Sequence, residues 1–258
     1  MMKKVTVILP IYEVKGRTCK CIDSILNQTE KDLEIICVCF DKSVEAEVYK
    51  LGYGDKIIIK VCDNLKAIFD SFNGKYITIM NSNDYILPNM YKEMLDLNKN
   101  YEADIIRTSF FEIKECNNIK DLNDYINHQN DSAHVIKGTF KIEDNPELLW
   151  GKSAMFTTLY RREFVKSNDI ELDEVLRKEY DDDIVYSFHS LAMLYADKII
   201  WNNNAYYCHY IDCKRNTNQK KEIEGLESYK KALIVLNKKF AGRDDILKVY
   251  YAQYLNII

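Results

Sequence analysis

The sequence lacks several features that mark common classes of protein. None of its 8 cysteines stands in a CxxC pair, so the pattern favours buried, reduced thiols over a zinc site or disulfides. The apolar run in the opening MMKKVTVILP is far too short for a signal-peptide core or a membrane span. The chain also has no internal repeat and no low-complexity segment. These absences predict a globular protein that stays in the cytoplasm.

An excess of basic residues is also missing. The chain has 36 Lys and Arg against 40 Asp and Glu, for a net charge of -4, and this balance argues against non-specific binding to nucleic acid. Its 258 residues are 47% hydrophobic, which is enough for one sizeable core with a smaller helical appendage.

Apolar runs alternate with amphipathic stretches along the first hundred residues. Strands are predicted at 5–10, 33–40, 56–61 and 76–80, and helices at 16–28, 43–51, 64–73 and 88–99. This alternation predicts an α/β fold with a mostly parallel, doubly wound sheet. Beyond it, we expect strands at 105–111, 198–201 and 205–210, helices at 183–195, 222–240 and 244–257, and a polar excursion over 112–145.

Four small polar residues end the fourth apolar run. Asn81, Ser82, Asn83 and Asp84 follow YITIM directly. Ligands bind at the carboxyl ends of strands in open α/β sheets, so this segment has the position of a binding site. The alternative is an Asx-rich turn that only joins the strand to a helix opened by Pro88.

An acidic cluster, Asp181-Asp182-Asp183, precedes a run with apolar residues at helical spacing. This pattern places the acids at the amino end of a helix, where the helix dipole favours a carboxylate. A carboxylate that ionises easily there is suited to act as a general base. Simple capping of the helix is the alternative.

Several segments occur in the order found in one enzyme family. They are VTVILPIYEVKGRTCKCIDSILNQTEKDLEIICV, GKYITIMNSNDYILPNM, LWGKSAMFTTLYRREFV and YDDDIVYSF. Together they resemble the family-two nucleotide-sugar glycosyltransferases, which have the GT-A fold. The resemblance covers roughly residues 3–215. It implies a GT-A domain over 1–215, with a nucleotide-binding half (1–111), an acceptor and catalytic half (146–215), and a helical segment at 216–258.

The same resemblance implies roles for individual residues. Asp183 matches the base that deprotonates the acceptor hydroxyl, and Tyr12 matches a tyrosine that lies against the nucleotide base. His209 would reach the pyrophosphate, and the indole of Trp150 would suit a sugar ring. Without the resemblance, Tyr12 and Trp150 fit an ordinary core and His209 fits a structural role. The full implied set is Pro10, Tyr12, Glu13, Asp41, Lys66, Asn81, Ser82 and His209 for the donor, Trp150, Lys152 and Asp182 for the acceptor, and Asn83 and Asp84 for a metal.

The chain departs from the family pattern around the donor. Cys39 and Phe40 stand where the family has an acidic pair, and Asn81 and Asn83 replace the acids of its D-S-D motif. An amide oxygen can bind Mg²⁺ or Mn²⁺ but brings no negative charge. We therefore expect a weakened metal site, with Asp84 as the remaining nearby carboxylate.

Three functions are compatible with these patterns. The first is an inverting enzyme that moves a sugar from a nucleotide-diphospho-sugar, UDP-linked by resemblance, to a cell-surface glycan or lipid-linked acceptor, with peripheral contact to the inner face of the membrane. The second is a catalytically impaired homologue that binds or assembles. The third, a nucleotidyltransferase-like enzyme, is disfavoured because no glycine-rich phosphate loop follows the first strand. Oligomeric state has no signal in the sequence.

Overall fold

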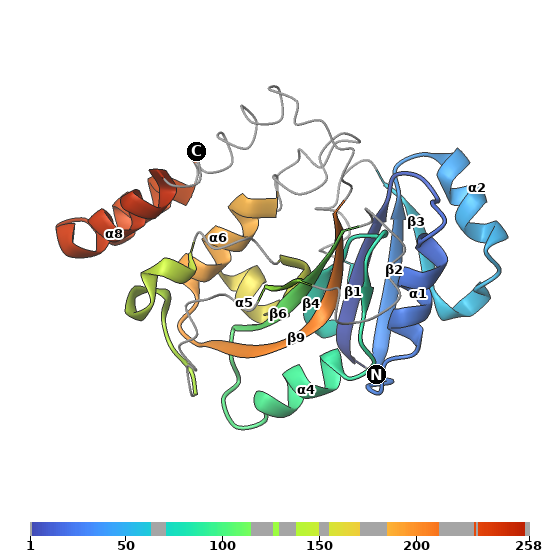
Figure 1. Ribbon diagram of the computed structural model, residues 1–258, viewed down its shortest axis with the longest axis horizontal. Coiled ribbons are helices and arrows are strands. Elements are labelled where there is room, and N and C mark those ends of the chain that lie inside the picture. The colour runs from blue at the N-terminus through green and yellow to red at the C-terminus, as the bar shows by residue number, and fades with distance from the viewer. Residues whose placement is uncertain are drawn as a thin grey trace.

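Parallel strands make up the amino-terminal half of a twisted sheet (Figure 1). The computed structural model describes residues 2–62, 71–114, 126–128, 138–149, 155–170, 185–211, 230 and 232–255. Four strands lie in the order β3-β2-β1-β4, and each neighbouring pair is parallel. They are β1 (Lys3–Ile11), β2 (Leu33–Cys39), β3 (Ile58–Val61) and β4 (Gly74–Ile79), alternating with helices α1 (Thr18–Leu26), α2 (Lys42–Lys50) and α4 (Met90–Leu97). This half confirms the predicted alternation of strands and helices.

The other half of the sheet mixes directions. β8 (Thr158–Arg161) runs antiparallel between β4 and β6 (Ile105–Lys114). β9 (Ile199–Ile211) is parallel to β6 and curves along its length, as Figure 1 shows in orange. Two short strands pair antiparallel with these long ones: β5 (Tyr85–Ile86) with β9 and β7 (Ile126–His128) with β6. The parallel pairs β1–β2, β2–β3, β1–β4 and β6–β9 join six of the strands, and every antiparallel pair includes one of the short strands β5, β7 and β8. The sheet is therefore mostly parallel, as predicted.

The remaining described helices are α5 (Arg162–Ser167), α6 (Val185–Tyr195), α8 (Asp244–Leu255) and the helical residues 232–239. Short 3₁₀ turns lie at Gly54–Lys56 in the first half and at Ile142–Asp144, Pro146–Leu148 and Met155–Thr157 in the second, and α8 packs on the turn Pro146–Leu148. Within the described ranges, no helix is long and apolar enough to cross a membrane.

Each face of the sheet has its own apolar core. Side chains of α1, α2 and α4 pack on one face, with Ile22, Val48 and Met94 all nearly inaccessible to solvent. Side chains of α5, α6 and α8 pack on the other face, where Phe164 and Phe188 are buried. The molecule therefore has three layers, helices on both sides of one sheet, which leaves the strand ends as the places where polar groups gather.

Three sequence predictions need correction. The segment before RREFV contains the strand β8, which was not predicted, because its four residues run directly into α5. The runs 198–201 and 205–210 are one strand, β9, whose polar centre is accommodated by a register shift opposite Thr108 and Ser109. The polar excursion over 112–145 contains β7 and a 3₁₀ turn. The predicted helix at 64–73 falls mostly outside the described residues.

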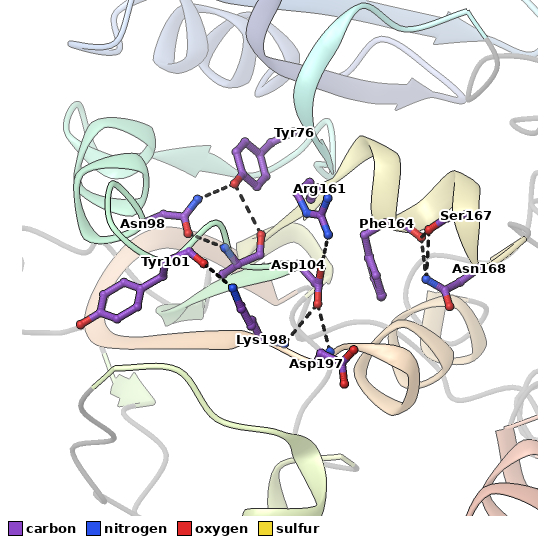
Figure 2. Close-up of polar contacts among 11 residues, drawn as sticks. Tyr76, Asn98, Tyr101, Asp104, Arg161, Phe164, Ser167, Asn168, Asp197 and Lys198 are labelled. Atoms are coloured by element: carbon purple, nitrogen blue, oxygen red, sulfur yellow. Dashed lines mark hydrogen bonds and ion pairs between the residues drawn. The ribbon is translucent and has the colours of Figure 1, made fainter.

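A charged network closes the amino edge of the second half of the sheet (Figure 2). The carboxylate of Asp104 pairs with the Arg161 guanidinium and accepts hydrogen bonds from the backbone N–H groups of Asp197 and Lys198 at 3.0 and 3.1 Å. Asp104 thus joins the end of β8 to the turn between α6 and β9. A cavity of about 460 Å³ opens beside it, lined by both basic and acidic side chains.

Candidate functional site

The carboxyl ends of β1, β2 and β4 lie next to one another. β1 is the centre of the three, with Ile11 opposite Cys39 of β2 and Ile8 opposite Ile79 of β4. The residues that follow these strands therefore meet at one edge of the sheet. This edge brings together Tyr12, Phe40, Asp41 and the polar segment that starts at Asn81.

Tyr12 and Phe40 form an aromatic pair at this edge. Their rings are stacked, with centroids 4.4 Å apart and planes only 5° from parallel. Pro10 is half-buried and stands opposite Val38 in the sheet. Glu13 is exposed and forms an ion pair with Lys15 at 2.6 Å. At position 40, where the resemblance implies an acid, this chain thus has an aromatic ring stacked on Tyr12.

Asp41 caps the amino end of α2. Its Oδ1 accepts hydrogen bonds from the backbone N–H groups of Ser43 and Val44, both at 2.9 Å. This satisfies two N–H groups that have no partner inside the helix. The predicted contact of Asp41 with the donor stays a prediction.

The polar segment after β4 forms a compact turn. The Asn81 side-chain oxygen accepts from the backbone N–H of Asn83 at 3.0 Å, and the Asn81 carbonyl accepts from the N–H of Asp84 at 3.1 Å. Ser82 is buried, and the Asn83 side-chain oxygen is buried with no hydrogen-bond partner among the described residues. The Asx-type turn expected from these residue types is therefore present, at the place where a ligand site was predicted.

Asp84 is turned toward β9. Its carboxylate is buried, with 1% of the residue exposed. One oxygen accepts from the Tyr207 hydroxyl at 2.7 Å and contacts His209 Nδ1 at 2.9 Å, and the other accepts from the Tyr210 N–H at 2.9 Å. Burial, and next the Asp84 charge, raise the pKa of the Tyr207 hydroxyl well above its usual value, so it stays a donor at neutral pH.

His209 lies between Asp84 and an aromatic side chain. Its ring stacks on Phe156, with centroids 5.1 Å apart and planes 17° from parallel. The family resemblance implies that His209 reaches the pyrophosphate, and in the structure His209 directly contacts Asp84 of the 81–84 turn. Its contact with a donor stays a prediction.

The motif SILNQT has a structural role that the sequence did not reveal. The Gln28 amide donates to the Leu87 carbonyl at 2.7 Å, and its oxygen accepts from the Tyr91 N–H at 3.3 Å. The Ser24 hydroxyl accepts from the Ile86 N–H at 3.2 Å. Ser24 of α1 and Gln28, just beyond the end of that helix, thus hold the segment that follows the turn. Polar residues next to the buried Ile22 and Ile25 were the signal in the sequence that could have revealed this role.

A second group that the sequence missed lies under α6. Arg107 is buried, its guanidinium lies 4.2 Å from the centre of the Trp201 ring, and burial lowers its pKa to about 10. His189 Nδ1 is 2.6 Å from the Tyr160 hydroxyl. Burial, followed by the Arg107 charge, lowers the pKa of His189 well below its usual value, so this imidazole is neutral at pH 7.

Five predicted site residues lie outside the described parts of the chain. They are Lys66, Trp150, Lys152, Asp182 and Asp183. The described part of α6 begins at Val185, two positions after the predicted base. Among the described residues, no group of three or more His, Cys, Asp or Glu side chains is arranged to hold a metal ion.

Comparison with known proteins places these features in a family. The model of "Glycosyl transferase family 2" matches residues 6–167. The glycosyltransferase GlyA of Streptococcus pneumoniae is 24% identical over 230 residues, covering 81% of this chain and 30% of GlyA. The poly(ribitol-phosphate) beta-glucosyltransferase of Bacillus spizizenii is 27% identical over 232 residues, covering 83% of this chain and 33% of that protein. The chain thus spans about a third of the length of these curated relatives.

The architecture agrees with solved structures. The crystal structure of S. aureus TarS 1-349 in complex with UDP-GlcNAc superposes with a TM-score of 0.72 at 17% identity, covering 98% of this chain and 73% of that one. The complex of the same protein with UDP gives a TM-score of 0.70 at 16% identity, covering 98% of this chain and 72% of that one. The family model covers more than half of the chain, and the sheet and its helices follow the same plan. The chain belongs to glycosyl transferase family 2 and has the GT-A fold.

Proposed function

We propose that the chain transfers a sugar from a nucleotide-diphospho-sugar, UDP-linked, to a cell-surface glycan or a lipid-linked acceptor, with inversion at the anomeric carbon. The observation that carries the proposal is the family match together with the meeting of Tyr12, Asp41 and the 81–84 turn at one edge of the sheet. Relatives whose names refer to UDP, UDP-GlcNAc and poly(ribitol-phosphate) support this class of donor and acceptor.

In the proposed reaction, an acceptor hydroxyl attacks the anomeric carbon of the donor sugar. The bond from that carbon to the diphosphate oxygen breaks, the nucleoside diphosphate leaves, and the hydroxyl proton passes to Asp183. Tyr12 lies against the base, and Pro10, Glu13, Asp41, Lys66, Asn81, Ser82 and His209 surround the donor. Trp150, Lys152 and Asp182 face the acceptor. The proposed site of action is the cytoplasm, at the inner face of the membrane when the acceptor is lipid-linked.

The described residues fit a divalent cation poorly. The Asp84 carboxylate already accepts three hydrogen bonds, and Asn81 uses its side-chain oxygen inside the turn. The buried Asn83 side-chain oxygen, which has no hydrogen-bond partner among the described residues, is of a type that can bind a cation but carries no charge. We therefore assign no step of the reaction to a metal, and weak Mg²⁺ or Mn²⁺ binding is part of the proposal.

A specific observation favours a second function. The acids expected at 39, 40, 81 and 83 are absent, and Asp84 holds β9. A catalytically impaired homologue that binds or assembles would tolerate all of these changes. Such a protein would transfer no sugar from any donor, whereas an active enzyme would transfer sugar from at least one.

A thermal-shift screen of nucleotide sugars, with and without Mn²⁺, tests the proposed donor. We expect stabilisation by a uridine-diphospho-sugar, because a ligand at 100 times its Kd adds about 2.7 kcal/mol to the stability of the folded state. Mn²⁺ should add little. If no nucleotide sugar in the panel raises the melting temperature, the donor assignment is wrong.

Restoring two acids should strengthen the metal response. In Asn81→Asp with Asn83→Asp, the side chain at 81 still accepts the hydrogen bond from the N–H of 83, so the turn should be retained. Two added carboxylates supply the charge that a hard cation prefers. We expect Mn²⁺ affinity in calorimetry to rise about tenfold or more, which corresponds to about 1.4 kcal/mol.

The control for added charge is Asn100→Asp. Asn100 is exposed and follows α4 at the other end of the sheet, so this variant should bind Mn²⁺ as weakly as the wild type. Tight Mn²⁺ binding to the donor-free wild type would contradict the weakened site.

A further inference from the structure

The hydroxyl of Tyr207 contacts both ends of the 81–84 turn. It donates to Asp84 Oδ2 at 2.7 Å and accepts from the backbone N–H of Asn81 at 3.3 Å. Tyr207 belongs to β9 and is completely buried. One side chain therefore fixes the distance between the first and last residues of the turn.

The backbone of β9 reinforces this contact. The Tyr210 N–H donates to Asp84 Oδ1 at 2.9 Å. Directly after the turn, β5 pairs antiparallel with β9, with Tyr85 opposite Cys208 and Ile86 opposite Tyr207. The chain is thus held on β9 both at the end of the turn and immediately beyond it.

The backbone carbonyl of Asn81 is engaged as well. The Asn81 carbonyl accepts from the Asp84 N–H at 3.1 Å and from the Cys21 thiol at 3.5 Å. Burial, and after it the Asp84 charge, raise the pKa of Cys21 well above its usual value, so this thiol remains protonated. With both ends and the interior bonded, a change at one end changes the geometry of the whole turn.

We propose that Tyr207 and Asp84 are positioning residues that set the conformation of the 81–84 turn for donor binding, without touching the donor themselves. This inference rests on the proposed function. With amides at 81 and 83 and the Asp84 carboxylate bonded to β9, the turn would hold a ligand through amide and hydroxyl groups, whose hydrogen bonds weaken steeply when their angles change. A turn without its two acids therefore depends on accurate placement more than one that binds through charge.

We call the two hydrogen bonds of the Tyr207 hydroxyl, to Asn81 and Asp84, the clamp. Tyr207→Phe tests the clamp with little disturbance to packing. It removes the hydroxyl and keeps the ring, which stacks on Phe156 with centroids 4.5 Å apart. The matched control is Tyr206→Phe. Within the described parts of the chain, the only hydrogen bond of that neighbour's hydroxyl is the one it accepts from the exposed Asn204 side chain, at 3.2 Å.

Two measurements are made on each variant. In hydrogen exchange, we expect the Asn81 amide to exchange at least about tenfold faster in Tyr207→Phe, because it loses its acceptor. In steady-state kinetics, we expect the KM for the nucleotide sugar to rise about tenfold while the KM for the acceptor is unchanged. Loss of folded protein alone would lower kcat and leave both KM values unchanged. Tyr206→Phe should match the wild type in both measurements.

Each other outcome has a definite meaning. Unchanged exchange at Asn81 overturns the clamp, and faster exchange with an unchanged donor KM overturns its positioning role. If the wild type transfers no sugar, the proposed function fails. The role of the clamp is then tested by hydrogen exchange and by calorimetry with uridine diphosphate. The affinity of uridine diphosphate for Tyr207→Phe should be about tenfold lower than for the wild type. Equal affinity would overturn the inference.

Discussion

Asp183→Asn should lower the rate of sugar transfer by a factor of about 10²–10⁴, the usual cost of losing a general base. Asparagine has nearly the same size and retains much of the capping ability of aspartate, but it cannot accept the proton. The melting temperature should therefore change little. The KM for the donor should also change little, because the proposed base faces the acceptor.

Asp181→Asn is the matched control. It removes a carboxylate from the same acidic cluster but from a position that does not match the family's base. We expect it to keep most of the activity. The measurement is the initial rate of transfer with the donor identified by thermal shift. Wild-type rates for Asp183→Asn would show that the catalytic assignment is wrong.

Asp104→Ala should have the largest effect on stability. The Asp104 carboxylate pairs with Arg161 and accepts from two backbone N–H groups, and the residue is only 6% exposed (Figure 2). Its removal leaves these donors without their acceptor, and because the Arg161 side chain is 32% exposed, the cost should lie at the lower end of that for a buried pair, about 3 kcal/mol. We expect the midpoint of thermal unfolding to fall by roughly 10 °C.

The control is Asp197→Ala at the same turn. The Asp197 side chain is 75% exposed and pairs with Lys141 on the surface, so its removal should cost less than about 1 kcal/mol. Its backbone N–H, which bonds to Asp104, is retained in this variant. Equal destabilisation by the two substitutions, measured by denaturant titration, would contradict the role assigned to Asp104.

The sequence predicted the regular half of the fold well. β1, β2 and β4 are continuous apolar runs because their strands are buried on both faces of the sheet, and such runs are visible without any knowledge of their partners. β8 and β5 were not predicted. They have four and two residues, and strands this short exist only because longer neighbours pair with them. The prediction of β9 as two runs failed at its three asparagines, residues that are rare in strands.

The candidate site also has features that the sequence could predict and features that it could not. Tyr12, Asp41 and Asn81 could be placed at one edge because each follows a strand of the parallel sheet. The stacking of Phe40 on Tyr12 and the hydrogen bonds from β9 to the Asp84 carboxylate could not be predicted. The hydroxyl of Tyr207 lies 123 positions along the chain from Asp84, and local patterns carry no information about pairings at that distance.

The pairing of β5 with β9 also has a consequence for the order of events during synthesis. β4, the turn and β5 leave the ribosome long before β9, and contacts between such distant segments form late and slowly. The nascent chain therefore carries the turn with its closing strand still missing. A fragment that stops at 167, where the family match ends, lacks α6 and β9. Expressed alone, such a fragment should expose the edge of β5 and tend to aggregate.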